Sequence, residues 1–250
     1  MINYNSNAIN DWNYGSDNIA KVYRDGDVVY QKVIDNTTPP SPSGLPSGYT
    51  EVEYVTTENI TATAVGPYID TGFIPNENTR VVMDYQAIVN QQNNRRIFGA
   101  GRFNNTSSGN YIWNQEGKIG SRSGKYYYKF DSGSSWLQTS INTDLNRHVV
   151  DFNREGKIWL DDTSIVTLPS YTFTCAYHLG LFNEIYDLST TNEYFQGRIY
   201  SCKVYDDGTL VRDFVPCTNP SNVAGMYDLV NNTFYGSADA NYPLEAGPTV

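Results

Sequence analysis

Residues 79–89 of the chain read TRVVMDYQAIV, and the alternation within this stretch decides the fold class. Successive side chains of a β-strand point to opposite faces, so every second residue shares a face. One face of this stretch is wholly apolar: Val81, Met83, Tyr85, Ala87 and Val89. The other face carries Arg80, Asp84 and Gln86 among two apolar residues. This pattern predicts a β-strand with one face in a core and the other mostly in water.

The chain from Tyr49 onward repeats this pattern in short segments separated by polar turns. Tyr177, Leu179 and Leu181 alternate with more polar neighbours, and a turn at 153–156 precedes a further strand at 157–160. No window of about eleven residues shows the 3.6-residue apolar period of a helix. We therefore expect an all-β fold in which two antiparallel sheets form a sandwich. The residues expected to face its core include Met83, Tyr85, Leu179, Leu181, Val204 and Phe214.

The composition agrees with this fold class and argues against several kinds of binding partner. The 250 residues suffice for one sizeable β domain, and Tyr (21) and Gly (20) are abundant. A formal charge of −10 with 17 Lys plus Arg argues against a nucleic acid or an anionic membrane as partner. No stretch approaches the roughly 18 apolar residues of a membrane span.

The first residues and the cysteines carry expectations about the cellular compartment. Residues 1–5 contain neither a basic segment nor an apolar run typical of secretion, so we expect the chain to be made in the cytoplasm. Cys175, Cys202 and Cys217 lack metal-ligand spacing, and cytosolic thiols usually stay reduced. We expect three buried free thiols and no cofactor.

The sequence predicts three parts: an N-terminal module at 1–34, a proline-rich linker at 35–48 and a large domain at 49–250. In the module, two β-prone runs at 19–24 and 28–34 flank Asp25-Gly26-Asp27, a sequence typical of a hairpin turn. A lone hairpin is marginally stable in water, so we expect it to attach the chain to a larger particle or to other copies, with a trimer as one candidate. The expected attachment residues are Val22, Tyr23, Val28, Tyr30 and Ile34.

Several segments of the large domain resemble a known family. YIDTGFIP (68–75) with IFGA (97–100), the hairpin from HVVDF (148–152) to KIWLDD (157–162), and the closing strands GRIYSCKVY (197–205), LVRDFVP (210–216) and GMYDLV (225–230) are similar to concanavalin A-like, laminin G-like jelly rolls of bacteriophage structural proteins. Asp162 stands where the family usually has Gly. The segment 18–23 and the hairpin after it also resemble short N-terminal leaders on phage particle proteins.

This resemblance implies a lectin-like jelly roll in a virion protein, for example a head fibre, tail fibre or decoration protein. It allows a weak adhesive contact with a surface glycan, and we expect no catalysis because the carboxylate pair of glycan-cleaving enzymes is missing. The alternative is a glycan-binding or glycan-degrading protein of a gut bacterium.

Catalysis of glycan hydrolysis would need two carboxylates flanking the scissile bond, about 5 to 5.5 Å apart in retaining enzymes. The related glycanases use Glu-x-Asp-x-x-Glu along one strand, and that motif is absent. Glu51 and Glu53 share one predicted strand face, whereas Glu184 and Asp187 are expected in a polar loop. His148 and His178 are expected to be ordinary strand residues, and the pairs at 161–162 and 206–207 to be turn residues and not calcium ligands.

Aromatic residues in polar surroundings are the remaining candidates for a binding site. Flat rings stack on sugar faces, while amides and hydroxyls pair with sugar hydroxyls. The candidate glycan contacts are Asn105, Trp113, Tyr126, Tyr128 and Trp136. Tyr and Trp also fill sandwich cores, so the sequence leaves open which of these rings reach solvent.

Overall fold

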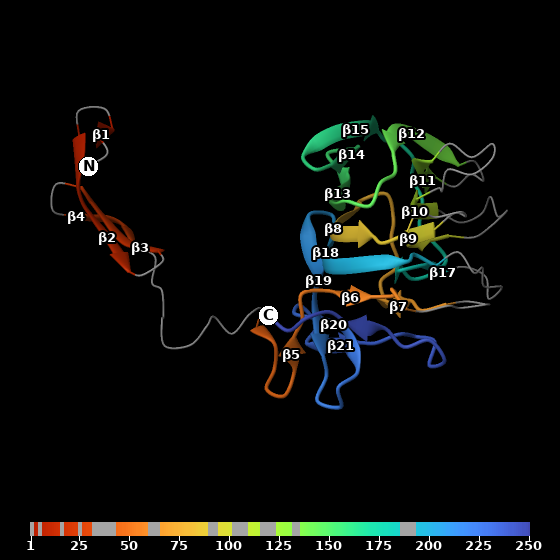
Figure 1. Ribbon diagram of the computed structural model, residues 1–250. Helices are drawn as coiled ribbons and strands as arrows, with labels where there is room; N and C mark the ends of the chain where they lie inside the picture. The colour runs from red at the N-terminus through yellow and green to blue at the C-terminus, as the bar shows by residue number, and fades with distance from the viewer. Residues whose placement is uncertain are drawn as a thin grey trace. The chain divides into compact units, whose positions relative to one another are not determined.

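The computed structural model describes residues 3–4, 7–15, 18–24, 27–31, 44–59, 66–89, 95–101, 110–115, 124–131, 136–185 and 194–250. The chain divides into two compact units, Met1–Pro42 and Ser43–Val250, each built from β-strands (Figure 1). No α-helix occurs within the described ranges, and therefore none of them contains a helix that could cross a membrane. The all-β fold class is confirmed.

The N-terminal unit is a four-stranded antiparallel sheet in chain order. Its strands are β1 (Asn3–Tyr4), β2 (Asn7–Gly15), β3 (Asn18–Arg24) and β4 (Asp27–Gln31). The pair β3–β4 is the predicted hairpin, whereas β1 and β2 were not predicted. Val22 and Tyr23 belong to β3 and Val28 and Tyr30 to β4, and Ile34 lies outside the described residues.

The C-terminal unit consists of two sheets. In the smaller, the described residues form seven strands: β7 (Ile69–Asp70), β9 (Arg95–Ala100), β10 (Asn110–Gln115), β11 (Lys125–Asp131), β12 (Leu137–Asn142), β16 (Gly180–Leu181) and β17 (Glu184–Ile185). Their order is β12-β11-β10-β9-β16-β7, and β17 runs parallel along β9. All the other strand pairs named for this sheet are antiparallel.

The larger sheet has eleven strands among the described residues, and the order along its main path is β15-β14-β13-β8-β18-β19-β20-β21. They are β5 (Thr50–Glu51), β6 (Val55–Thr56), β8 (Thr79–Ala87), β13 (Arg147–Arg154), β14 (Lys157–Leu160), β15 (Thr163–Thr167), β18 (Gly197–Asp206), β19 (Thr209–Thr218), β20 (Ala224–Asp228), β21 (Thr233–Tyr235) and β22 (Glu245–Ala246). The predicted strand at 79–89 is β8, at the middle of this sheet. Val89 lies beyond its end and is 38% exposed.

The core lies between the two sheets. The hydroxyl of Tyr111 on β10 donates to the carbonyl oxygen of Thr79 on β8 at 3.0 Å, and Phe98 on β9 packs edge-on against Phe152 on β13. The predicted core residues are all buried completely: Met83, Tyr85, Leu179, Leu181, Val204 and Phe214. Cys175, Cys202 and Cys217 are buried free thiols, as predicted, and burial raises the pKa of each.

The hairpin turn at Asp161-Asp162 has a backbone conformation that Gly adopts more easily than most residues. Both residues adopt left-handed backbone angles, with φ of 49° and 58°. Asp tolerates this region better than most residues because its short side chain hydrogen-bonds locally. Asp161 Oδ1 also accepts from the amide of Val149 on β13 at 2.9 Å, which ties the turn to that strand.

Candidate functional site

Three of the rings predicted to contact a glycan are core residues. Trp113, Tyr126 and Tyr128 are 0, 1 and 6% exposed. Trp113 stacks on Tyr126 at 4.9 Å, and its Nε1–H donates to the Tyr85 hydroxyl at 3.2 Å across the sandwich. The prediction was wrong for these three rings, because they lie on the faces of β10 and β11 that point into the core. Asn105 lies outside the described residues.

Trp136 is the predicted ring that does not belong to the core. It immediately precedes β12 and is half-buried. Its ring lies over two cations, with its centroid 4.4 Å from Cζ of Arg96 and 5.0 Å from Nζ of Lys129. Arg96 and Lys129 are only 4 and 2% exposed, so the ring is the outermost of the three. Together with Glu184 these residues form the Trp136 cluster.

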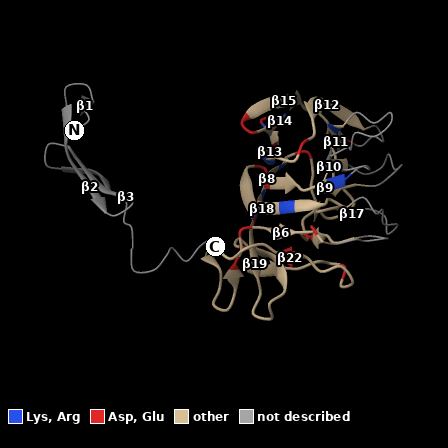
Figure 2. Ribbon diagram, in the orientation of Figure 1, with Lys and Arg blue, Asp and Glu red and all other residues tan. Residues whose placement is uncertain are grey.

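Strand alternation places Lys129 on the outer face of the smaller sheet, and a register shift between β9 and β10 separates Arg96 from the core residue Phe98. Lys129 lies in β11 between Tyr128 and Phe130, which point into the core, so it points away from the core. Arg96 comes from β9, where Figure 2 shows a blue segment, and Glu184 comes from β17 beside it. Glu184 pairs with Gly99, where an added Cβ would lie 3.1 Å from the Glu184 Cβ. Glycine at this position therefore lets the Glu184 side chain lie close against the sheet.

The charges of the Trp136 cluster are held away from water. Arg96 Nε and Glu184 Oε2 form an ion pair of 3.1 Å, and the two side chains are 4 and 6% exposed. Burial lowers the pKa of Lys129, while the nearby carboxylates of Glu184 and Asp131 oppose this change. The expectation that Glu184 lies in a solvated loop was wrong, and its partner in that expectation, Asp187, is outside the described residues.

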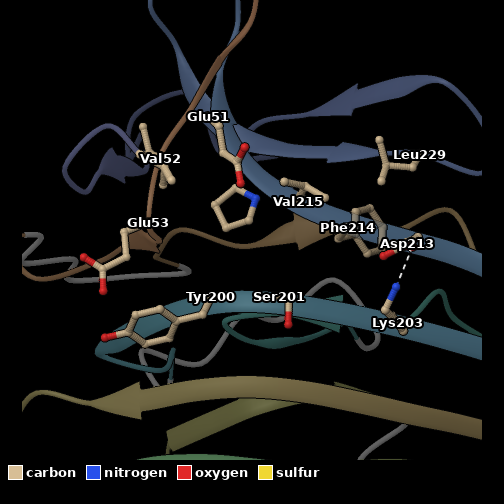
Figure 3. A pocket seen from close by; sticks show the side chains of 12 residues that line it. Glu51, Val52, Glu53, Tyr200, Ser201, Lys203, Asp213, Phe214, Val215 and Leu229 are labelled. Carbon is tan, nitrogen blue, oxygen red and sulfur yellow. Dashed lines mark hydrogen bonds and ion pairs between the residues drawn. The ribbon is translucent and has the colours of Figure 1, made fainter. Parts of the chain in front are cut away.

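A separate pocket lies on the larger sheet (Figure 3). It has a volume of about 410 Å³. It is lined by residues of β5, β18 and β19, by residues just after β5 and β20, and by Val250: Glu51, Val52, Glu53, Tyr200, Ser201, Lys203, Asp213, Phe214, Val215, Pro216, Leu229 and Val250. Its lysine, Lys203, is bound to Asp213 at 2.6 Å. Glu51 and Glu53, the two carboxylates predicted to share a strand face, therefore both line this pocket.

His148 has a role that the sequence did not reveal. It was expected to be an ordinary strand residue, and it does lie in β13. However, its Nδ1 is 2.6 Å from Asp161 Oδ2 and its Nε2 is 2.8 Å from Asp144 Oδ1, so the ring bridges two carboxylates. His178 likewise contacts Asp70, at 2.9 Å, and lies outside the strands. The sequence signal for this role was two Asp residues, Asp144 just before β13 and Asp161 just after β14.

Metal ligands and relatives give no further indication of function. Within the described ranges, no three His, Cys, Asp or Glu side chains gather closely enough to hold a metal ion. The Asp206-Asp207 pair is a turn, in which Asp207 has a φ of 46° and Asp206 accepts from the Asn76 side chain at 3.1 Å.

In comparisons with known proteins, no family model matches the chain and no curated protein matches it.

Proposed function

We propose that this protein is a non-enzymatic structural and adhesive component of a bacteriophage particle, such as a head fibre, tail fibre or decoration protein. In this proposal the N-terminal unit attaches the chain to the particle or to other copies. The C-terminal unit is a lectin-like jelly roll that contacts a surface glycan weakly.

The observation that carries this proposal is the division of the chain into two β units. The division falls between Pro42 and Ser43, inside the proline-rich segment 35–48, whose composition favours an extended spacer. A small sheet followed by a spacer and a large sandwich suits a protein that is held at one end and binds at the other. Many weak sites on one particle give useful avidity, because each bound copy raises the effective concentration of the next.

The N-terminal unit is the part that this proposal assigns to attachment. Its described residues form four strands, and a unit as small as residues 1–42 seldom buries enough apolar surface to be stable alone. Docking on a particle or association with other copies would supply the missing contacts. A closed homo-oligomer, for example a trimer, is the arrangement that symmetry favours.

The test is incorporation into particles. Deleting residues 1–34 should abolish incorporation because the attachment unit is lost. Circular dichroism of the truncated protein should still show a folded sandwich. A matched control with point changes at Trp136 should enter particles normally. Incorporation of the truncated protein at the level of the full chain would refute the attachment role.

The alternative, a glycan-active protein of a gut bacterium, makes a different prediction. Incubation with a panel of β-glucans would release new reducing ends if the chain were a glycanase. The closest acidic candidates, Glu51 and Glu53, line the pocket of Figure 3, so Glu51→Gln and Glu53→Gln would then remove the activity.

A further inference from the structure

The pocket on the larger sheet has room for a small ligand. Its volume of about 410 Å³ falls within the range of small-molecule sites, about 300 to 1,000 Å³. Figure 3 shows Glu51 and Glu53 on one side of this pocket, and Tyr200, Ser201 and Lys203 along β18 on the other. Segments that lie about 150 residues apart in the sequence therefore face each other across one cavity.

The side of the pocket that carries the glutamates is held in place by its backbone. The amide of Val52 donates to the carbonyl oxygen of Pro216 on β19 at 3.1 Å. The amide of Glu53 donates to the carbonyl oxygen of Pro248 at 2.8 Å. These two hydrogen bonds fix the segment between β19 and the last residues of the chain, so the cavity is formed before any ligand arrives.

The charged residues of the lining are mostly acidic. They are the three carboxylates of Glu51, Glu53 and Asp213 and one ammonium, that of Lys203, which gives the lining a formal charge of −2. Lys203 is bound to Asp213 at 2.6 Å, so its charge is already matched within the pocket. A cleft that carries charge of one sign between less polar walls concentrates ions of the opposite sign. The lining therefore favours a cationic ligand.

A further cation, Arg147, lies against the pocket wall and is also matched. Its guanidinium stacks on the ring of Tyr200, with Cζ 3.6 Å from the ring centroid. Its Nε and Nη2 donate to the two carboxylate oxygens of Asp84, each at 2.8 Å. Arg147 and Asp84 together are neutral, so they leave the negative charge of the lining in place.

The remaining walls of the pocket are apolar. Val52 is buried, and Val215 and Leu229 are half-buried and line the same cavity. An alkyl chain gains free energy by leaving water for such walls, whereas a bare inorganic cation does not. The ammonium group offers three N–H donors, which suits a site with several carboxylate oxygens and the hydroxyl of Ser201.

We infer that this pocket binds a primary alkylammonium group. The ammonium lies near Glu51, Glu53 and Ser201, and the alkyl stem packs against Val215 and Leu229. Such a group is found on the lysine side chains of proteins and on free polyamines. The inference goes beyond the proposed attachment role and does not depend on it.

Titration of the full chain with matched small probes tests the inference. In about 0.15 M salt, which screens the surface charges, 1-pentylamine should bind saturably at concentrations up to about 10 mM. 1-Pentanol has the same stem without the charge and should bind about tenfold more weakly, because two ion pairs are lost. Methylamine has the charge without the stem and should not saturate in this range.

Methyl NMR signals of the unmodified protein locate the binding. 1-Pentylamine should shift the signals of Val215 and Leu229. The control is Val149, which is 40% exposed on β13 of the same sheet and does not line the pocket. Its signal should stay in place.

Two variants change the charge of the pocket in opposite directions. Glu53→Gln should weaken binding of 1-pentylamine about two- to fivefold, the usual effect of an exposed ion pair. Lys203→Met should strengthen it by a similar factor, because the Asp213 carboxylate is then no longer matched. A merely structural role of Lys203 would not produce tighter binding. Glu155→Gln is the control, since it removes one exposed carboxylate in the turn between β13 and β14, and it should leave binding unchanged.

Two further probes distinguish the sources of the ammonium group. Nα-acetyl-lysine N-methylamide represents a lysine side chain of a protein, and cadaverine represents a free polyamine. Tighter binding of the lysine derivative indicates a protein partner, and tighter binding of cadaverine indicates a polyamine.

Three results would overturn the inference. They are equal binding of 1-pentanol and 1-pentylamine, no saturable binding of 1-pentylamine, and binding that leaves the Val215 and Leu229 signals unshifted. The NMR signals come from the unmodified protein, so the test stays decisive even if a variant fails to fold.

Discussion

His148 shows how one side chain makes the stability of the sandwich depend on pH. Burial lowers the pKa of His148, but its hydrogen bonds to Asp161 and Asp144 outweigh this and raise the pKa above its usual value. The charged imidazole donates from both nitrogens, one to each carboxylate, and so links the turn before β13, which holds Asp144, to the turn between β14 and β15, which holds Asp161. The charged form is therefore favoured in the folded protein relative to the unfolded chain.

The expected consequence is a loss of stability as the pH rises. A pKa raised by folding contributes stability that is fully present below the unfolded pKa, about 6.5 for His, and disappears as the pH passes the folded pKa. The free energy of unfolding, measured by urea denaturation, should therefore fall from about pH 6.5 upward. His148→Gln should remove this fall. His178→Gln is the control and should retain it, and an unchanged slope in His148→Gln would contradict the assignment.

Single residues also show where sequence reasoning stops. Alternation correctly predicts that Tyr126 and Tyr128 share a face, but it does not say which face of β11 meets the core, because Tyr127 offers a third ring on the other face. The answer depends on β10, where Trp113 stacks on Tyr126. Such cross-strand contacts arise from strand pairing, which a single sequence does not specify.

At the scale of elements, strands with a clean period of two are the ones that the sequence predicts. β8 alternates buried and half-buried residues along its whole length, as the pattern of 79–87 requires. β17 has only two residues, and it carries Glu184 into the Trp136 cluster. A two-residue strand is too short to show an alternating pattern, so the sequence did not predict that Glu184 belongs to the sheet. β1 and β2 were missed because the Asn-rich stretch 3–15 has no regular apolar alternation.

The strand β16 gives the element-scale prediction. Leu181 is completely buried between its neighbours Ile69 on β7 and Phe98 on β9. Leu181→Ala should lower the free energy of unfolding by about 2 to 5 kcal/mol, because it leaves a cavity in a packed core. Leu137→Ala is the matched control on β12 of the same sheet, where the side chain is 37% exposed. It should cost less than roughly 0.5 kcal/mol. Equal losses in urea denaturation would mean that burial does not distinguish these positions.

At the scale of the whole molecule, the division of the chain between Pro42 and Ser43 lies inside the linker predicted at 35–48. A Cβ at Gly44 would lie 3.8 Å from Leu229, and one at Gly48 would lie 3.2 Å from the Pro220 ring. The Tyr49 amide also donates to the Pro46 carbonyl at 3.2 Å. The segment from Gly44 to Gly48 therefore touches the sandwich, although only Leu45 is half-buried and the other four residues are exposed. The composition does not reveal this contact, because the proline-rich sequence continues without a break to Gly48.

This packing predicts where a protease will cut the full chain. Cleavage requires the backbone to enter the protease in an extended form, which packed segments resist and exposed linkers allow. The stretch 35–48 contains no Lys or Arg, so a protease of broad specificity such as proteinase K is needed in place of trypsin. Limited digestion followed by intact-mass measurement should yield a stable fragment that begins between residues 36 and 44 and ends at Val250. A fragment that begins after Gly48 would show that residues 44–48 open with the linker. One that retains residues 1–34 would show that the N-terminal unit and the spacer are protected together, and the two-unit organisation would then be wrong.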